Sequence, residues 1–450
     1  MNVHFIAIGG AAMHNLALAM HQTGHSVTGS DDEIFEPSKG RLAAAGLLPE
    51  ATGWNPDRLT ASIDAVILGM HARIENPELL KAQEMGLRVY SYPEFIYERS
   101  LDKTRVVIAG SHGKTTITSM ILHVLKKLDR DFDYLVGAQI EGFDTMVRLS
   151  DAPIIILEGD EYLSSPIDRR PKFHLYHPRI ALISGIAWDH INVFPTWDIY
   201  KEQFSLFIDD LEPGAHLAYC STDETLSEMT IKHGSEINTH AYETPPHKIE
   251  NGRTIILDGG EYAISVFGDH NLQNMNGARI VCESLGIEKD LFYNTIADFT
   301  GASRRLEIIR EIADGAVYKD FAHSPSKLSA TVRAVKKQWP DRKLIAAMEL
   351  HTFSSLTKEF LKEYSGSMND ADEAIVFYKE ETIAHKKLDP ISIQEVVASF
   401  GRADLIVFTT TAQLQKHLES MAWKDANLLL MSSGNFGGMN VDEFGASLLD

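Results

Sequence analysis

Short apolar runs alternate with helical segments along nearly the whole chain. Near the N-terminus, VHFIAIGG, HSVTGSD and DAVILGM have the length and composition of buried strands, and MHNLALAMHQTG has the apolar spacing of a helix. Strands that alternate with helices predict parallel sheets with helices packed on their faces. The same alternation recurs in PIIILEGDEY and RIALISGIAWDH, and again in KLIAAMEL, EAIVFYKE and ADLIVFTT. We therefore expect an α/β protein.

The length of the chain predicts more than one domain. Its 450 residues exceed what a single hydrophobic core usually supports. The stretch YSYPEFIYER closes the first strand–helix block, and the turn-forming residues of DFTGASRR interrupt the pattern near residue 301. We predict a Rossmann-like N-terminal domain at residues 1–100, a P-loop-type central domain with a mainly parallel sheet at 101–300, and a Rossmann-like C-terminal domain at 301–450.

Net charge and composition exclude several classes of function. The formal net charge of -21 argues against nucleic acid and anionic membranes as partners, so an anionic substrate would need positive side chains within its site. The two cysteines, Cys220 and Cys282, are too few for a disulfide framework, which fits a reducing cytoplasm. The N-terminal MNVHFIAIGG lacks the basic and long apolar parts of a signal peptide, and no apolar run approaches membrane-spanning length. We expect a cytoplasmic protein.

The stretch RVVIAGSHGKTTITSMILHVL predicts a phosphate-binding loop between a strand and a helix. Backbone N–H groups at such a helix start point toward an anion, the lysine reaches its phosphates, and the following threonine can bind Mg²⁺. The common pattern has a further glycine five residues before Gly113, where this chain has Ile108, so the loop is shorter. The alternative is a plain strand-to-helix turn with a solvated lysine. The predicted loop residues are Gly110, Ser111, His112, Gly113, Lys114, Thr115 and Thr116.

Acidic residues follow two later apolar runs. Glu158, Asp160 and Glu161 end one run, and Asp189 and His190 end another. Ligands of open parallel sheets bind outside the carboxyl ends of the strands, so these residues would meet the phosphate loop if the strands are parallel. Carboxylates there could hold the magnesium that bridges phosphates. The alternative for the acidic residues is a solvated loop, and the alternative for His190 is a capping or core histidine. Because magnesium prefers oxygen ligands, physical chemistry alone does not select His190 as a ligand.

The first apolar run ends in a glycine turn that matches the dinucleotide-binding pattern only weakly. Gly9 and Gly10 are followed by Ala11, Ala12 and Met13, which is not G-x-G-x-x-G. Asp31, at the end of the second run, stands where a ribose-binding acid belongs. The fold is expected to be Rossmann-like, and the ligand could be any nucleotide or sugar nucleotide. A tight turn with Asp31 as a helix cap is the alternative.

With these motifs in order, the chain resembles the Mur ligases of bacterial cell-wall synthesis over nearly its whole length. The stretches that carry the resemblance are HFIAIGG, VTGSD, GSHGKTT, EGDEY, WDH, GDHNLQN, SRRLE, YKDFAHSP and SSGNFGG. The resemblance implies three domains: an N-terminal one for the uridine nucleotide, a central one for ATP and Mg²⁺, and a C-terminal one that closes over the amine substrate. Residues Gly9, Gly10, Asp31 and His71 would lie at the UDP-sugar.

The resemblance also implies roles for individual residues at the ATP site. Lys114 would contact phosphate, Thr115 and Glu158 would bind magnesium, and His190 would bind a second magnesium. Lys114, His190 and Arg305 would be catalytic. The further nucleotide-binding residues would be His270, Asn271, Asn274, Arg305, Asp320 and His323.

Within the family, the chain is similar to the branch that uses UDP-N-acetylmuramate as the acid substrate. The stretch EGDEYLSSPIDRRPKFHLYHPR is similar to members that attach the tripeptide L-alanyl-γ-D-glutamyl-meso-diaminopimelate, and attachment of L-alanine is the alternative. ATP would convert the lactyl carboxylate into an acyl phosphate that the amine attacks. The sequence departs from the family pattern at Gly159, where alanine is usual, at Lys319, in place of an acid, and at Ser324, in place of a histidine. The stretch LSSPI after Tyr162 is also unlike the tripeptide-adding members. These departures concern the identity of the amine substrate more than the reaction with ATP.

Two other classes of function stay open at this point. A nucleotide-driven conformational switch would hydrolyse ATP without any UDP-sugar. An NAD-dependent oxidoreductase is less consistent with the sequence, because its fingerprint is incomplete and it leaves GSHGKTT unexplained.

Overall fold

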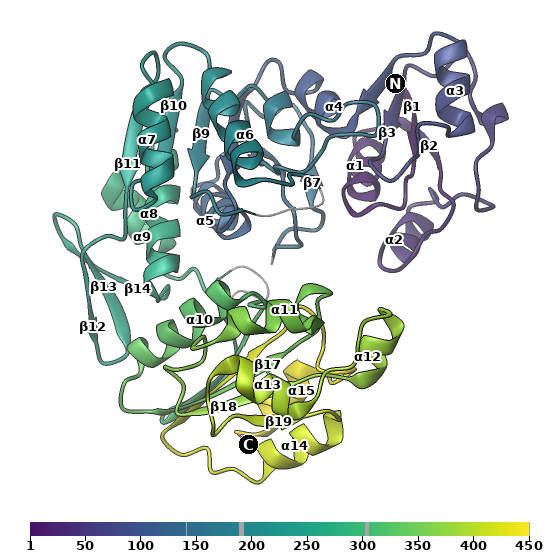
Figure 1. Ribbon diagram of the computed structural model, residues 1–450. Coiled ribbons are helices and arrows are strands. Elements are labelled where there is room, and N and C mark those ends of the chain that lie inside the picture. Colours follow the sequence, from purple (N-terminus) through teal and green to yellow (C-terminus); the bar gives the residue numbers. More distant parts are fainter. Residues whose placement is uncertain (141, 189–192, 302–305, 450) are drawn as a thin grey trace. The chain divides into compact units, whose positions relative to one another are not determined.

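A computed structural model of the chain describes residues 1–140, 142–188, 193–301 and 306–449 (Figure 1). Its residues form two compact units. The first unit combines Met1–Glu243 with Gln273–Thr295, and the second combines Thr244–Leu272 with Ile296–Asp450. The described residues form four sheets and the helices around them.

The first unit begins with a four-stranded sheet in the order β2-β1-β3-β4, and all of its strand pairs are parallel. Short apolar strands such as AVIL are fully buried because helices cover the sheet. Figure 1 shows this sheet in purple and blue. Its elements are β1 (Asn2–Ile6), α1 (Ala11–Gln22), β2 (Ser26–Ser30), α2 (Ser38–Ala44), β3 (Ala65–Leu68), α3 (Pro77–Glu84), β4 (Val89–Ser91) and α4 (Tyr92–Glu98).

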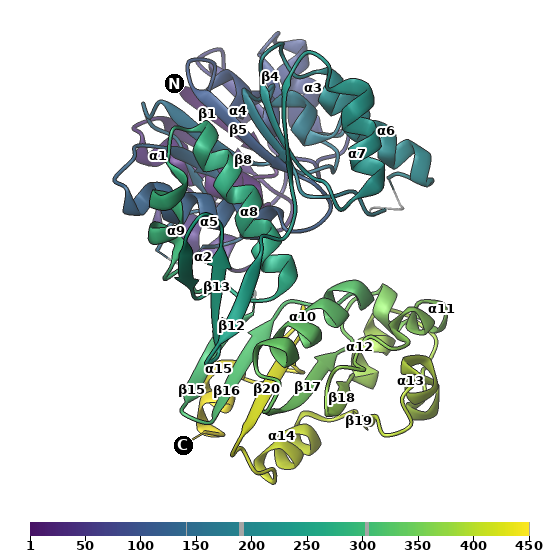
Figure 2. The same cartoon turned by 90° about the vertical axis from the view of Figure 1, so that its left-hand side faces the viewer.

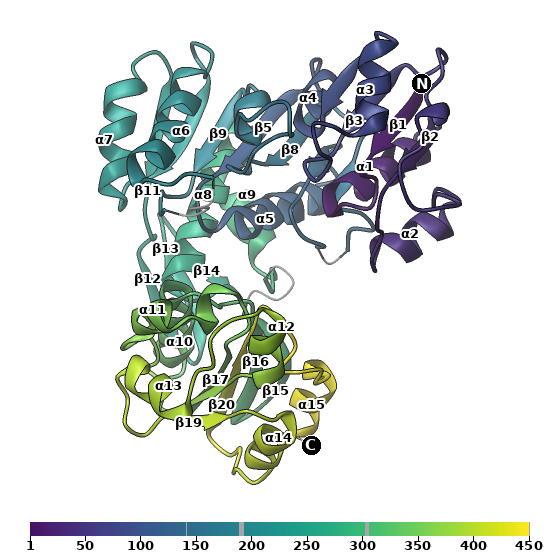
Figure 3. The same ribbon diagram turned by 45° about the vertical axis from the view of Figure 1, so that its right-hand side comes forward.

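A seven-stranded sheet completes the first unit, in the order β11-β10-β9-β5-β8-β6-β7. All pairs are parallel except β6–β7. Figure 3 shows α6 and α7 beside each other in this unit, and they are in contact. The strands are β5 (Thr104–Ala109), β6 (Asp133–Leu135), β7 (Val147–Arg148), β8 (Ile154–Glu158), β9 (Ile180–Ile183), β10 (His216–Cys220) and β11 (Asn238–Tyr242). The helices are α5 (Lys114–Lys127), α6 (Trp197–Asp209), α7 (Glu224–His233), α8 (Asp269–Ser284), which continues into the second unit, and α9 (Lys289–Ile296).

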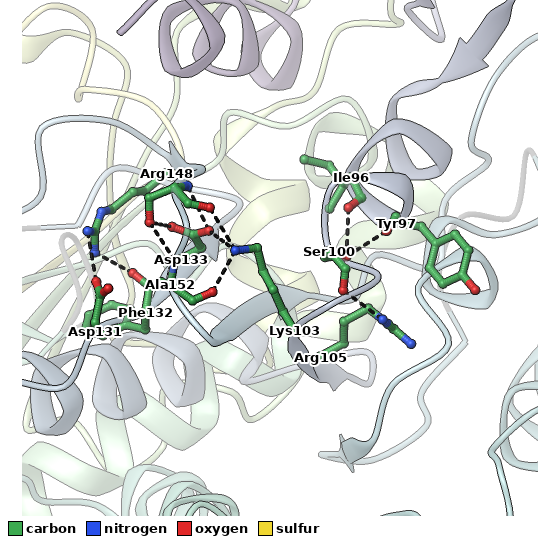
Figure 4. Close-up of polar contacts among 11 residues, drawn as sticks. Ile96, Tyr97, Ser100, Lys103, Arg105, Asp131, Phe132, Asp133, Arg148 and Ala152 are labelled. Atoms are coloured by element: carbon green, nitrogen blue, oxygen red, sulfur yellow. Dashed lines mark hydrogen bonds and ion pairs between the residues drawn. The ribbon is translucent and has the colours of Figure 1, made fainter. Parts of the chain in front are cut away.

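A buried lysine fixes the start of the seven-stranded sheet, directly after α4 (Figure 4). The Lys103 ammonium donates to the carbonyls of Ser150 at 2.8 Å and Ala152 at 2.6 Å, and lies 3.2 Å from Asp133. The two side chains are 4% and 0% exposed, so the charges compensate each other away from water. Arg105 donates to the Ser100 carbonyl at 2.8 Å, which ties β5 to the residues after α4.

The second unit contains a three-stranded antiparallel sheet and a six-stranded sheet in the order β15-β16-β20-β17-β18-β19. Only β15–β16 is antiparallel in the larger sheet. Figure 2 shows β12 and β13 beside each other in this unit. The strands are β12 (His247–Glu250), β13 (Arg253–Leu257), β14 (Glu261–Ile264), β15 (Glu307–Ile312), β16 (Gly315–Asp320), β17 (Lys343–Glu349), β18 (Glu373–Phe377), β19 (Ile406–Phe408) and β20 (Ala426–Met431). The helices are α10 (Pro325–Gln338), α11 (Lys358–Leu361), α12 (Glu380–His385), α13 (Ile393–Phe400), α14 (Thr411–Glu419) and α15 (Val441–Ser447).

Both faces of the six-stranded sheet are buried, because successive side chains of a strand point to opposite faces. Ala346 and Met348 of β17 share one hydrophobic cluster with α10 and α13, whereas Ile345 and Ala347 share another with α14 and α15. Apolar residues therefore occupy every position from Leu344 to Met348. This arrangement matches the continuous apolar runs from which parallel strands were predicted.

The α/β class and the mainly parallel sheets were predicted, and the fold confirms them. The antiparallel strands β12–β14 were not expected, and they pack in the second unit although the predicted central block included them. The boundaries near residues 100 and 301 stay a prediction. Cys220 and Cys282 are free and buried. In the part of the chain that the structure describes, no helix has the length and apolar character needed to span a membrane.

Candidate active site

The phosphate loop connects the end of β5 to the start of α5. Gly110 and Gly113 have backbone φ angles of 118° and 81°, which L side chains rarely adopt. A Cβ atom on Gly110 would lie 2.7 Å from the Ser184 backbone nitrogen, and one on Gly113 would collide with the Asn274 side chain. Among the described residues, no side chain caps the N-terminus of α5. Its first-turn N–H groups therefore remain available for an anion.

Lys114, the first residue of α5, is held against its own loop. Its ammonium donates to the Gly110 carbonyl and to Glu161, each at 2.6 Å. The Glu161 side chain is only 2% exposed. Burial alone would lower the pKa of Lys114, but the negative charges of Glu161, Asp160 and Glu158 raise it above its ordinary value. A cation is thus fixed where the phosphates of a nucleotide would lie.

Thr115 and Glu158 place a hydroxyl and a carboxylate oxygen close together next to this lysine. The Thr115 hydroxyl donates to one Glu158 oxygen at 2.8 Å, and the Gly137 backbone N–H donates to the other at 2.8 Å. Burial raises the pKa of Glu158, although both hydrogen bonds act in the opposite direction. Hydroxyl and carboxylate oxygens suit Mg²⁺, which usually takes one or two carboxylates and completes its shell with water and phosphate. No group of three His, Cys, Asp or Glu side chains within the described residues is arranged to hold a metal alone.

The topology brings the predicted strand ends together. The central strand β5 lies between β8 and β9 and is parallel to both, so the phosphate loop, Glu158 and the segment after Ile183 share one edge of the sheet. Asp189, His190 and Arg305 lie outside the described residues. Their predicted roles therefore stay predictions.

Several residues that support the loop were not identified from the sequence. Ser184, after β9, donates from its hydroxyl to the His112 carbonyl, and the backbone of Ser111 donates to the Gly185 carbonyl at 3.0 Å. Tyr200 of α6 contacts the Ser111 hydroxyl at 2.8 Å. No pattern near Tyr200 in the sequence signals this contact. Gly137 was also missed, because its role is played by a backbone N–H group.

The predicted UDP-sugar residues lie at the carboxyl edge of the first sheet. The Gly9 backbone N–H donates to Asp31 at 2.7 Å, and a Cβ atom on Gly9 would lie 2.9 Å from the same carboxylate oxygen. Burial and the neighbouring Asp32 raise the pKa of Asp31 to about 6. Asp31 is not a helix cap, since α2 begins at Ser38. Gly10 precedes α1, and the exposed His71 follows β3.

The residues predicted to lie near the adenine and ribose fall on α8, which continues from one compact unit into the other. His270 and Asn271 belong to the second unit and Asn274 to the first. Burial lowers the pKa of His270 to about 4, so the imidazole is neutral at physiological pH. The Asn271 amide donates to the Phe267 carbonyl at 3.2 Å. Asn274 lies close to the phosphate loop, because its side chain occupies the space that a Cβ atom on Gly113 would need.

In the second unit, a cleft of about 180 Å³ opens at the carboxyl ends of β16 and β20, and Lys319, Asp320, Ser432 and Asp442 contribute to its wall. Lys319 forms ion pairs with Asp442 at 2.5 Å and Glu307 at 3.0 Å. The wall of the cleft therefore carries both positive and negative charge.

Two further predicted residues of the second unit brace its backbone. Asp320 accepts the backbone N–H groups of Leu306 and Ala322, each at 2.6 Å, and therefore fixes the turn after β16. His323 Nδ1 lies 2.9 Å from the Phe321 carbonyl oxygen.

Taken together, the first unit offers what a nucleoside triphosphate requires: uncapped helix N–H groups, glycines that leave room at the loop, a fixed ammonium and two oxygen ligands for magnesium. The residues present therefore fit ATP and Mg²⁺. This arrangement could stabilise charge that develops on a phosphoryl group.

Comparison with family models supports the same interpretation over most of the chain. Three models of one family match consecutive segments. They are the Mur ligase family catalytic domain at residues 2–103, the Mur ligase middle domain at 108–282 and the Mur ligase glutamate ligase domain at 304–434.

Individual relatives match along nearly their full length. The chain is 28% identical to a UDP-N-acetylmuramate–L-alanine ligase of Lactobacillus delbrueckii subsp. bulgaricus, covering 96% of this chain and 95% of the relative. It is 27% identical to a UDP-N-acetylmuramate–L-alanyl-γ-D-glutamyl-meso-2,6-diaminoheptandioate ligase of Haemophilus influenzae, covering 98% and 97%. The crystal structure of a UDP-N-acetylmuramate–alanine ligase from Thermotoga maritima superposes with a TM-score of 0.70 at 19% identity, covering 97% and 96%. The chain thus belongs to the Mur ligase family, whose members are ATP-dependent ligases that form C–N bonds.

Proposed function

We propose that this enzyme joins the lactyl carboxylate of UDP-N-acetylmuramate to the amine of the tripeptide L-alanyl-γ-D-glutamyl-meso-diaminopimelate, at the expense of ATP and in the cytoplasm. The observation that carries the proposal is the phosphate loop, in which Lys114 is fixed by Glu161 and Thr115 is paired with Glu158. Relatives that act on UDP-N-acetylmuramate, with nearly equal identity to this chain, support the acid substrate.

The chemistry requires activation of a poor acyl donor. An oxygen of the lactyl carboxylate attacks the γ-phosphorus of ATP, and ADP leaves. The amine then attacks the carbonyl carbon of the acyl phosphate, loses a proton, and expels inorganic phosphate. Both steps build negative charge on oxygens. The Lys114 ammonium, the N-terminus of α5 and a cation held by Thr115 and Glu158 would stabilise that charge.

The tripeptide is favoured over L-alanine by the stretch from Glu158 to Arg179, which is similar to tripeptide-adding members, and by the Haemophilus influenzae relative. In the structure, residues 163–171 of this stretch turn back on themselves after β8, and a short 3-10 helix follows at Lys172–Leu175. Ser164 N donates to the Arg170 carbonyl and Ser165 N to the Asp168 carbonyl, both at 3.0 Å. Addition of L-alanine is the second candidate, and the Lactobacillus relative favours it.

The test is release of phosphate from ATP and Mg²⁺ with UDP-N-acetylmuramate, measured in parallel with the tripeptide, with L-alanine and with no amine. The proposal predicts release with the tripeptide. Lys114→Ala should abolish it, whereas Lys201→Ala, at an exposed ion pair with Asp198, should not. Release with L-alanine alone would refute the amine substrate. Release without any UDP-sugar would instead favour an ATP-driven switch.

A further inference from the structure

A chain of hydrogen bonds links the middle of the phosphate loop to its lysine through a residue of a distant helix. The Ala187 backbone N–H donates to the Ser111 hydroxyl oxygen at 2.8 Å, and that hydroxyl lies 2.8 Å from the Tyr200 hydroxyl. Tyr200 donates to one oxygen of Glu161 at 3.3 Å, and Lys114 donates to the other at 2.6 Å. The buried Tyr200 hydroxyl therefore contacts both Ser111, in the middle of the loop, and Glu161, which holds Lys114.

The chemistry of the groups sets the direction of this chain. A carboxylate only accepts hydrogen bonds, so the single Tyr200 hydrogen points to Glu161. The hydroxyl of Ser111 then supplies the hydrogen between Ser111 and Tyr200, and its oxygen accepts from Ala187. Each hydroxyl acts as donor and acceptor at once, and such chains strengthen their members in a low-dielectric interior.

The surroundings of Tyr200 restrict its movement. Tyr200 is 0% exposed and Glu161 is 1% exposed. The tyrosine ring packs against Phe194 at 5.5 Å and Phe204 at 5.4 Å between ring centroids. Its hydroxyl is therefore held at one position between Ser111 and Glu161, which in turn limits rotation of the Glu161 carboxylate.

We propose that Tyr200 and Glu161 are positioning residues that hold the Lys114 ammonium over the phosphate loop, ready for phosphoryl transfer. The inference rests on the proposed function. Loss of the Tyr200 hydroxyl removes one of the contacts that orient the Glu161 carboxylate, and this weakens the anchor of the lysine. A fixed positive charge stabilises the transition state of phosphoryl transfer more than it stabilises bound ATP. Loss of the Tyr200 hydroxyl therefore lowers kcat more than it weakens ATP binding.

The kinetic test compares Tyr200→Phe with Tyr242→Phe. Tyr242 is a matched control, since it is buried in the same unit and its hydroxyl has no hydrogen-bond partner among the described residues. Tyr200→Phe should lower kcat about ten- to a hundredfold, the range of a hydrogen bond to a charged group, with a smaller change in KM for ATP. Equal kcat in the two variants, or an increase in KM alone, overturns the proposal.

Substitution of Ser111 interrupts the same chain of hydrogen bonds and remains informative even if Tyr200→Phe does not fold. Ser111→Ala should lower kcat, and Ser111→Thr, which keeps the hydroxyl, should restore it. In the double variant Ser111→Ala/Tyr200→Phe the two losses of kcat should not add, because both substitutions break the same chain of hydrogen bonds. Additive losses, or a threonine variant as impaired as the alanine variant, contradict the proposal.

Labelling of lysines in the nucleotide-free protein tests the positioning separately from ligase activity. An acylating reagent should modify Lys114 several-fold faster in Tyr200→Phe than in the wild type or in Tyr242→Phe, as read by peptide mass spectrometry. Lys81, whose side chain is exposed beside Glu84, serves as the internal reference. An unchanged Lys114 rate overturns the inference even if the enzyme is a ligase. A wild type without ligase activity refutes the proposed function, and the labelling still decides the inference.

Discussion

Replacement of Gly113 by alanine tests the geometry of the phosphate loop with a single methyl group. The residue has a φ angle of 81°, and alanine in this left-handed region costs about 1–2 kcal/mol. The added Cβ would also collide with the Asn274 side chain. Overpacking of this kind adds about 1–3 kcal/mol. We therefore expect Gly113→Ala to destabilise the protein by about 2–5 kcal/mol in total.

Gly286→Ala separates the two contributions. Gly286 has a φ of 78°, almost the same as Gly113, but a Cβ there would meet no atom within 4 Å. Thermal unfolding of the two variants should therefore differ by the steric contribution alone. The double variant Gly113→Ala/Asn274→Ala removes the colliding atoms and should recover much of that difference.

The same variants report on activity. Displacement of the loop by the new methyl group should lower phosphate release about a hundredfold in Gly113→Ala, because a shift near 1 Å at a reacting site has effects of that size. Gly286→Ala should release phosphate at the wild-type rate. If Gly113→Ala is as stable and as active as Gly286→Ala, Asn274 does not lie against the loop, and the account of the site is wrong.

Three further predictions concern buried charges. Glu158→Gln removes the carboxylate that Thr115 and Gly137 orient, so phosphate release should fall at least tenfold and stay low at high Mg²⁺; full rescue by magnesium would contradict its role as a ligand. The pKa of Asp31 is raised from 3.8 to about 6, so its contribution to stability is present below pH 4 and is lost as the pH rises through 6. Asp31→Asn should therefore be more stable than the wild type at pH 8, by about 3 kcal/mol in the free energy of unfolding, and equally stable at pH 4. A constant difference across this range would argue against a buried titrating carboxyl. Lys103→Ala leaves Asp133 buried without its cation and should cost about 3–5 kcal/mol, whereas Lys81→Ala, at an exposed pair with Glu84, should cost less than about 1 kcal/mol in the same unfolding assay.

Much of the fold follows from local patterns in the sequence. Continuous apolar runs such as IIILE predicted buried parallel strands, and in the structure β8 pairs in parallel with β5. That pairing explains why Glu158 meets the phosphate loop. The strands β12–β14 were not predicted, because they are short, partly exposed and carry no apolar run longer than three residues.

The parts of the site that were missed depend on contacts between distant segments. Tyr200 lies 89 residues after Ser111, and nothing in its own neighbourhood distinguishes it from an ordinary buried aromatic residue. Gly137 acts through its backbone, which leaves no side-chain signature in a sequence. The position of Asp31 at the end of the second strand was predicted. Its hydrogen bond to Gly9 was not, because that bond depends on how the ends of two strands lie relative to each other.

The central claim, ligation of a tripeptide to UDP-N-acetylmuramate through an acyl phosphate, is tested most directly by one labelled competition. The enzyme is given ATP, Mg²⁺, equimolar L-alanine and tripeptide, and UDP-N-acetylmuramate that carries ¹⁸O in its lactyl carboxylate. Products and phosphate are then identified by mass spectrometry. The account predicts the tripeptide adduct and phosphate that contains one ¹⁸O atom from the carboxylate. An L-alanine adduct as the main product, or phosphate without ¹⁸O, would contradict it.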